Sequence, residues 1–465
     1  MSRITLIQPR HTYAPDHCDG AKGHIYMPTS LLTVAARLLL AGVGVSVYDE
    51  NMSPKLFEAE IIGVNLLGAP YVERVRELRD RLGAGGASVS LVVGGQVVSG
   101  FRPEELVLLF GESVVNGNDD FSLAAALGMD ARALPSPRQT SLIPAYELVD
   151  EQSMRAYLQE EFGFFLSQGC RFSCSFCAAH RTRRDPIAGE VSAVNEVYRA
   201  ADIVEQDLLY LTIRAQTLGL NRLRIYLSNL DLFQSPDGLS EFLTAVEHVR
   251  MLVPAVSLEM RGLSTVHSFL EVHRSRPDLI ERFVVLGLRR IGFGVDGVAP
   301  EVWRATKKPQ SGSMCVDAIV IARKVYGITP ENLMVFGHFD VDTEGSLSLA
   351  VEFTRAMLGE YGALPRPHVA KSVVPGNDGW YSPACRPIVE KLLAWPQGFQ
   401  SLDFTALPSL LTHPDAGFRE VATKYYLQAC GIEGAITRYV LPETPDLDAD
   451  GIRQVREFNQ GKYDI

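Results

Sequence analysis

Short apolar runs alternate with stretches of helical periodicity through the first 125 residues. The apolar runs cover residues 4–7, 45–48, 61–67, 89–93 and 113–115, and helical spacing is clearest in 31–40, 71–82 and 104–110. Strands that alternate with helices predict a parallel, doubly wound sheet, Rossmann-like in its organisation. Ligands of such sheets bind beyond the carboxyl ends of the strands. Glycines stand at two of these ends, with Gly94 and Gly95 after the fourth run and Gly117 after the fifth.

A second series of apolar runs follows a segment that is rich in turn residues. Residues 126–160 contain Pro135, Pro137 and Pro144 and lack a clear period, which predicts a linker. Six runs then end in polar residues or glycine: 162–167, 223–227, 255–260, 291–295, 333–336 and 368–374. Six βα units over residues 161–380 predict a partial (β/α)6 barrel, whose catalytic groups belong at the carboxyl ends of the strands. Residues 381–465 are predicted to be a helical region, because 388–393 and 418–429 are amphipathic at helical spacing.

Composition and charge narrow the class of protein. The chain has 465 residues and 46% hydrophobic residues, which suits two or three domains. No apolar run approaches the roughly 18 to 20 residues that span a bilayer, and residues 2–8 do not resemble a secretory signal. We therefore expect a cytoplasmic protein without a membrane partner. The net charge of −11 argues against general nucleic-acid binding, which requires basic residues to neutralise phosphates.

Three of the seven cysteines stand together directly after the first predicted barrel strand. Cys170, Cys174 and Cys177 are spaced C-x3-C-x2-C. Thiolates at this spacing can surround one iron–sulfur centre and leave a fourth position open. A structural zinc site is the alternative, because His180 would complete a Cys3His tetrahedron. The other four cysteines are scattered and are interpreted as core thiols: Cys18, Cys315, Cys385 and Cys430.

The cysteine spacing, with the aromatic Phe176 before the last cysteine, resembles the radical S-adenosylmethionine (radical SAM) superfamily. The resemblance implies a [4Fe-4S] cluster on the three cysteines and SAM on the open iron. An electron from a donor such as flavodoxin or ferredoxin would cleave SAM to a 5'-deoxyadenosyl radical. The resemblance also implies cofactor contacts at the strand ends, beside the methionine part, the carboxylate or the ribose of SAM. These residues are Phe176, Ser228, Asn229, Asp231, Arg261 and Asp296.

The order of the amino-terminal elements resembles the cobalamin-binding domain that precedes the barrel in one subgroup of this superfamily. That resemblance implies cobalamin as a further cofactor, near Gly94, Gly95 and Gly117. The Asp-x-His-x-x-Gly signature for a cobalt ligand is absent. Asp16 and His17 come close but lack the residue between them, so the lower cobalt ligand is left open.

The resemblance thus implies a cobalamin-dependent radical SAM enzyme, a methyltransferase that acts on an unactivated carbon or phosphorus of a small molecule. A first alternative keeps the cluster and SAM but catalyses a rearrangement, ring contraction, cyclisation or oxidation without methyl transfer. A second, from another class, is a non-enzymatic binding protein stabilised by zinc.

Overall fold

The computed structural model describes the chain in two compact units. It covers all residues except 1–2, 11–25, 53–60, 85–89, 96, 112–114, 117–119, 180–195, 339, 405, 410–412, 414 and 437–465. The first unit comprises Met1–Gly169, Ala179–Asn229 and Ser240–Glu259. The second comprises Cys170–Ala178, Leu230–Leu239 and Met260–Ile465. Within the described part of the chain, no helix is both long and apolar enough to cross a membrane.

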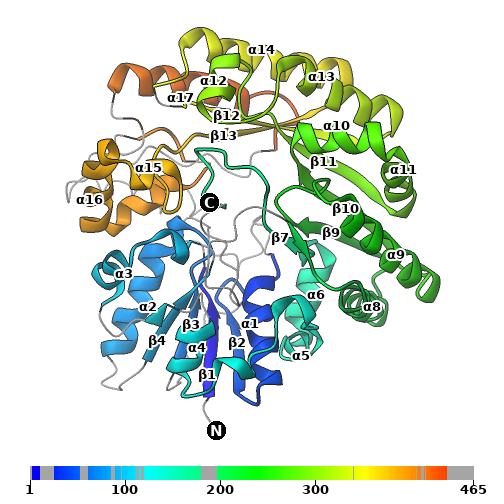
Figure 1. Cartoon of the computed structure of the whole chain (residues 1–465), viewed down its shortest axis with the longest axis vertical. Helices are drawn as coiled ribbons and strands as arrows, with labels where there is room; N and C mark the ends of the chain where they lie inside the picture. Colours follow the sequence, from blue (N-terminus) through cyan, green and yellow to red (C-terminus); the bar gives the residue numbers. More distant parts are fainter. Residues whose placement is uncertain are drawn as a thin grey trace. The chain divides into compact units, whose positions relative to one another are not determined.

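The amino-terminal sheet has five strands in the order β2-β1-β3-β4-β5, and all its neighbours are parallel (Figure 1). Its strands are β1 (Arg3–Gln8), β2 (Gly44–Asp49), β3 (Ile61–Asn65), β4 (Ser90–Gly94) and β5 (Val115–Asn116). The order confirms the predicted doubly wound sheet. From β1 the chain first adds β2 on one side and then β3, β4 and β5 on the other. The point between β1 and β3 is therefore a topological switch point, where sheets of this kind bind ligands.

Burial explains why the central strands read as continuous apolar runs. Ile4, Leu6 and Ile7 on β1 are all buried, although neighbouring side chains on a strand point to opposite faces. A strand buried on both faces is typical of a parallel sheet that helices cover on both sides. The helices of this region are α1 (Thr29–Leu40), α2 (Val72–Ala84), α3 (Pro103–Phe110) and α4 (Asp120–Ala126).

The segment predicted to be a linker contains two helices, α5 (Ile143–Tyr146) and α6 (Glu151–Gln159). Asp150 begins α6, because its carboxylate accepts hydrogen bonds from the Ser153 amide at 2.9 Å and hydroxyl at 2.6 Å. Met154, Tyr157 and Leu158 form the buried face. The Tyr157 hydroxyl donates to Asp49 at 2.7 Å, so this helix is tied to the end of β2.

The second sheet has six strands in the order β13-β12-β11-β10-β9-β6. They are β6 (Glu161–Phe165), β9 (Arg222–Ser228), β10 (Ser257–Ser264), β11 (Leu288–Gly294), β12 (Thr329–Phe336) and β13 (Leu364–Val369), and β7 (Ser167–Gln168) and β8 (Val197–Tyr198) pair separately. The pairs β6–β9, β10–β11, β11–β12 and β12–β13 of this sheet are parallel. Two parallel sheets confirm the predicted α/β class.

β12 and β13 each begin four residues earlier than the apolar pattern predicts. β12 starts at Thr329 rather than 333, and β13 occupies 364–369 rather than 368–374. The early part of each strand contains prolines, which the sequence pattern counts against a strand: Pro330 in β12, and Pro365 and Pro367 in β13. β13 is an edge strand, and an edge tolerates residues that cannot donate a ladder hydrogen bond.

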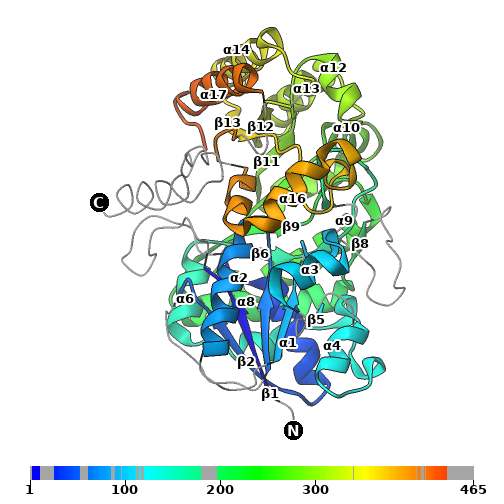
Figure 2. The same cartoon turned by 90° about the vertical axis from the view of Figure 1, so that its left-hand side faces the viewer.

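Helices follow the strands along the second half of the chain. They are α8 (Ala201–Thr217), α9 (Pro236–Leu252), α10 (Val266–Ser275), α11 (Pro277–Leu286), α12 (Pro300–Ala305), α13 (Gly312–Val320), α14 (Glu344–Tyr361), α15 (Asp378–Tyr381), α16 (Arg386–Ala394) and α17 (Ala416–Cys430). Figure 2 shows α14 beside α17, and both pack against β12 and β13. Asn332 of β12 donates to Thr354 of α14 at 3.3 Å, which marks the helix-covered face of this sheet.

We expect Gly95→Ala to destabilise the protein by about 3 kcal/mol, near the upper end for single substitutions. A Cβ at Gly95 would lie 2.5 Å from the Leu66 carbonyl oxygen, at a φ of +115°. Gly42→Ala is the matched control, because Gly42 also has a positive φ of +81° but nothing lies within 4 Å of its added Cβ. The control should cost about 1–2 kcal/mol. Urea unfolding measures both, and equal losses would contradict a close approach at Gly95.

Candidate functional site

The cysteine loop, residues 170–178, belongs to the second unit. Cys170, Cys174 and Cys177 are half-buried thiols. The Cys177 amide donates to the Cys174 carbonyl at 3.1 Å, so the loop turns between these two ligand candidates. His180, the fourth ligand of the predicted zinc alternative, lies outside the described residues, as does Cys18.

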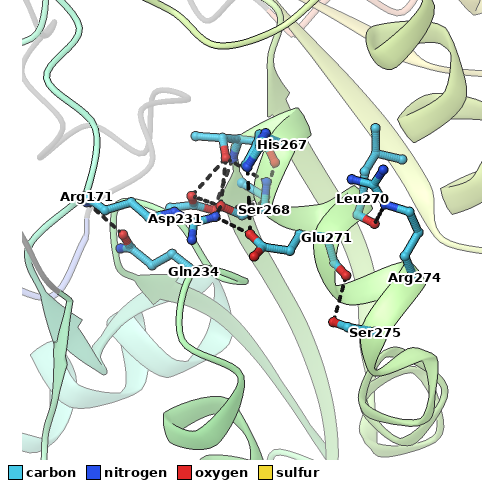
Figure 3. A network of polar contacts seen from close by, with 11 residues as sticks. Arg171, Asp231, Gln234, His267, Ser268, Leu270, Glu271, Arg274 and Ser275 are labelled. Atoms are coloured by element: carbon cyan, nitrogen blue, oxygen red, sulfur yellow. Dashed lines mark hydrogen bonds and ion pairs between the residues drawn. The ribbon is translucent and has the colours of Figure 1, made fainter.

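Arg171 anchors the first half of the loop (Figure 3). Its amide donates to Gln234 Oε1 at 3.0 Å, and its guanidinium donates to Glu271 at 2.6 Å and Ser268 Oγ at 3.0 Å. The same guanidinium lies 5.1 Å from the centre of the Phe172 ring, a cation–π distance. The first half of the loop has no regular secondary structure, and both the backbone and the side chain of Arg171 hold it in place.

Ser175 and Phe176 anchor the second half of the loop. The Ser175 amide donates to the Thr306 carbonyl at 3.1 Å, and the Ser175 carbonyl accepts from the Asp378 amide at 3.1 Å. The Phe176 ring meets His338 edge-on at 5.5 Å between centroids. These contacts fix the loop to the segment after α12, to the segment after β12 and to the start of α15.

The donor set fits an iron–sulfur cluster in its chemistry. Burial raises the pKa of Cys170 to about 12 and that of Cys174 to about 11, so both are protonated at neutral pH. A metal centre binds thiolates and must displace these protons. Within the described residues, no three His, Cys, Asp or Glu side chains are already gathered as metal ligands. The assignment of the three cysteines as ligands stays a prediction.

Asp231 is fully buried beneath the loop, and its carboxylate is occupied by neighbouring residues (Figure 3). It accepts hydrogen bonds from the hydroxyls of Ser264 at 3.0 Å, Thr265 at 2.9 Å and Ser268 at 2.6 Å, and from the Thr265 amide at 3.1 Å. Burial raises the pKa of Asp231, and the hydrogen bonds from Ser268 and Thr265 oppose that rise. Because Ser268 also accepts from Arg171, Asp231 is connected to the loop through one residue, Ser268. The sequence resemblance had placed Asp231 beside SAM.

Asp296 follows β11 and forms a buried ion pair with Lys308. Asp296 has a φ of +55°, an uncommon value for a residue with a side chain. Gly294 leaves room for the pair, because an added Cβ would lie 2.7 Å from Lys308 Nζ. Burial by itself lowers the pKa of Lys308, but Asp296 and then Cys174 outweigh it and leave the pKa raised. The charge of Lys308 in turn opposes the effect of burial on the pKa of Cys174.

The remaining predicted residues are divided between the two units. Ser228 is the half-buried last residue of β9, and Asn229 after it is buried, both in the first unit. Arg261 lies within β10 rather than after it, because the strand extends to Ser264. Its Nη1 is 3.5 Å from Glu331 Oε2, a long ion pair.

The predicted glycines all belong to the amino-terminal sheet. Gly94 is half-buried at the end of β4. Gly95 follows in a conformation that the close backbone of Leu66 requires. Gly117 lies outside the described residues. Gln8 and Asn65, which sequence reasoning did not select, end β1 and β3, and Asn65 Nδ2 donates to Gln8 Oε1 at 2.7 Å.

Two buried basic side chains, Lys371 and His413, were also missed. Lys371 is buried and donates to the Ala406 carbonyl at 2.8 Å, and burial lowers its pKa to about 7. His413 lies 2.7 Å from the Gly337 carbonyl oxygen, and burial followed by the charge of Lys371 lowers its pKa to about 3. His338 Nε2 lies 3.2 Å from the Asp296 carbonyl oxygen. Lys371 falls inside an apolar run, so no pattern distinguished it.

Comparisons with known proteins bear on the family and the fold. Residues 164–350 match the family model of the Radical SAM superfamily. The chain is similar in structure to the radical S-adenosylmethionine methyltransferase TsrM from Kitasatospora setae, solved with tryptophan substrate and the SAM analog aza-SAM. That match has 15% identity and a TM-score of 0.59 and covers 84% of this chain and 76% of TsrM. Among curated proteins, none matches this chain in sequence.

A second solved structure extends the likeness. It is the cobalamin-dependent S-adenosylmethionine radical enzyme OxsB with aqua-cobalamin and S-adenosylmethionine bound. The match has 12% identity and a TM-score of 0.57, and it covers 87% of this chain and 56% of OxsB. At such identities the likeness concerns the fold.

We expect Lys308→Met to destabilise the protein by roughly 3–5 kcal/mol, because it leaves the Asp296 carboxylate buried without its partner. The two side chains of this pair are 6% and 10% exposed. Lys307→Met is the control, since its ion pair with Asp378 has side chains 60% and 31% exposed and should contribute at most about 1 kcal/mol. Denaturant unfolding compares the two. The double variant Lys308→Met/Asp296→Asn should recover part of the loss, and similar midpoints for both single variants would refute the buried pair.

The burial of Lys371 predicts a pH dependence of stability. Its folded pKa of about 7 lies below the ordinary 10.5, so between these values the unfolded chain binds a proton that the folded chain does not. The wild type should therefore gain stability relative to Lys371→Met as pH rises from 7 towards 10, and lose that gain as pH falls. Thermal unfolding at several pH values measures the difference. Parallel curves for the two proteins would show that Lys371 is not held in a desolvated site.

Proposed function

Since the chain carries a radical SAM domain over residues 164–350, we propose that it is a cobalamin-dependent radical SAM enzyme. We further propose that it is a methyltransferase that acts on an unactivated carbon or phosphorus of a small molecule. The observation that carries the proposal is the cysteine loop at the start of the matched domain, in a chain that also has a doubly wound amino-terminal sheet. The likeness of most of this chain to TsrM and OxsB supports the combination.

The proposed cofactors divide the chemistry among them. A reduced [4Fe-4S] cluster supplies the electron that cleaves SAM to a 5'-deoxyadenosyl radical, and methylcobalamin supplies the methyl group. In this proposal Cys170, Cys174 and Cys177 hold the cluster. A flavodoxin or ferredoxin in the cytoplasm would be the electron donor.

The other residues of the loop and its surroundings hold the site in place. Arg171 and Ser175 keep the cysteine backbone in position through their hydrogen bonds. Phe176, Ser228, Asn229, Arg261 and Asp296 are proposed to contact SAM. Asp231 is proposed as a positioning residue instead, because all of its described hydrogen bonds go to β10 and α10. Fixed charges around a reacting centre need no reorganisation when charge develops there.

Cobalamin is assigned to the carboxyl edge of the amino-terminal sheet. Gly94, Gln8 and Asn65 end neighbouring strands at the switch point, where a doubly wound sheet receives its ligand. Gly95 contributes through the backbone conformation that lets β4 end beside Leu66. Gly117 keeps its proposed role, and Asp16 and His17, like it, lie outside the described residues.

The test is anaerobic reconstitution with iron, sulfide and hydroxocobalamin, followed by metal analysis and a visible spectrum. We expect about four irons and one cobalamin per wild-type chain. Cys174→Ala should lose the iron and keep the corrin, whereas the control Cys385→Ala should keep both. Iron without cobalamin would leave a radical SAM enzyme but remove methylcobalamin from the mechanism. Zinc without iron would overturn the enzyme and favour the zinc-stabilised alternative.

A further inference from the structure

A buried carboxylate on β12 faces two arginines from other strands of the second unit. Glu331 Oε2 accepts from Arg366 Nη1 at 2.9 Å and lies 3.5 Å from Arg261 Nη1. The exposed fractions of the side chains are 1% for Glu331, 9% for Arg261 and 23% for Arg366. Two guanidinium groups therefore lie against one buried carboxylate, and Arg366 is the more exposed of the two.

The Nε and Nη2 edge of the Arg366 guanidinium is not used by its bond to Glu331. Among the described residues, Glu331 is its one ion-pair and hydrogen-bond partner, and that bond uses Nη1. The edge formed by Nε and Nη2 has the spacing that binds both oxygens of a carboxylate. The partial exposure of this side chain allows a small molecule to reach it.

His368 stands two residues further along β13 and therefore on the same face. Within the described part of the chain, its Nδ1 is buried and has no hydrogen-bond partner. Buried polar atoms are rarely left unsatisfied, so an unpartnered nitrogen points to a missing ligand group. Burial, followed by the charge of Arg366, lowers the pKa of His368 to about 4 and keeps the ring neutral. A neutral ring can donate one hydrogen bond without adding charge.

This face of the sheet is also the one that carries the Lys308–Asp296 pair. A Cβ on Gly292 of β11 would meet the side chains of Leu333 at 2.8 Å and Glu331 at 3.5 Å, which places all three on one face. Gly294, two residues on, faces Lys308 and Asp296. The opposite face is covered by helices such as α14.

Apolar side chains flank Arg366 and His368. Leu333 pairs in register with Arg366, and Val335 with His368, and both are half-buried. The Phe404 ring meets His368 edge-on at 6.2 Å, yet it is 54% exposed. An exposed aromatic beside a neutral imidazole, on the strand that also carries Arg366, suits a ligand that has both an apolar body and an acid.

We propose that Arg366 and His368 form the subsite for the carboxylate of the substrate, a small organic acid whose apolar body lies against Phe404. This inference rests on the proposed radical SAM function and adds a substrate class to it. Arg366 would hold both carboxylate oxygens, His368 would donate a further hydrogen bond, and Glu331 would keep the guanidinium in position.

Benzoate and benzamide are the probes, because they have the same shape and differ in charge. Binding is measured on reconstituted protein by ligand-observed saturation-transfer NMR, with saturating SAM present so that the carboxylate of SAM cannot account for the result. We expect benzoate to bind wild type at least tenfold more tightly than benzamide. Arg366→Met should lose about tenfold or more in benzoate affinity, and Arg366→Lys should lose less because it keeps the charge but not the fork.

Arg222→Met is the matched control. Arg222 is also a strand arginine paired with a glutamate, Glu259, at 3.6 Å. The Arg222→Met variant should bind benzoate with the affinity of wild type. Unfolding midpoints show whether Arg366→Met has folded, and Arg366→Lys can still pair with Glu331 if it has not. Wild type that does not prefer benzoate, benzoate that SAM displaces, or Arg366 variants with unchanged affinity would each overturn the subsite. Iron content and SAM cleavage are measured in the same samples, so a failure of the radical SAM function is recognised separately.

Discussion

The buried carboxylate of Asp231 is the constraint on which the cysteine loop depends. A carboxylate removed from water is costly unless donors replace its hydration, and three hydroxyls and one amide do so here. Ser268 connects Asp231 to the loop, because its hydroxyl donates to Asp231 and accepts from Arg171. The end of β10, the start of α10 and the loop that carries Cys170 are thereby joined around one buried charge.

Other buried charges of the second unit gather on the face of the sheet opposite to the one that α14 covers. Lys308 is paired with Asp296, and Arg366 with Glu331. Buried ion pairs contribute little net stability compared with apolar residues of the same size. The helix-covered face supplies the apolar packing instead, through residues such as Met334 and Phe336. This division of labour is typical of a scaffold that holds preorganised charges for chemistry.

The proposed chemistry places contrasting demands on the cysteine loop. Burial raises the pKa of Cys170 to about 12 and that of Cys174 to about 11, yet a cluster requires thiolates. Lys308 reduces that cost at Cys174, because a nearby cation favours the thiolate. Arg171 and Ser175 keep the backbone of the loop in place without occupying the sulfur atoms.

Local pattern in the sequence was enough for the α/β class, the two parallel sheets and the place of the cysteines after β6. Apolar periodicity records which backbone a segment adopts and how far it is buried, and the C-x3-C-x2-C spacing is local as well. The same local pattern did not predict α6, whose apolar face is short and follows the Asp150 cap. Nor did it predict the bounds of β13, which contains prolines that are tolerated because this strand lies at the edge of the sheet.

Only the tertiary structure decided which polar residues meet. Asp231 and Ser268 are 37 positions apart, Glu331 and Arg366 are 35 apart, and Lys308 reaches Asp296 across 12. Strand register and sheet face bring these side chains together, and neither is written in the spacing along one segment. For the same reason the sequence marked Asp231 only as a strand-end residue, whereas the fold surrounds its buried carboxylate with Ser264, Thr265 and Ser268.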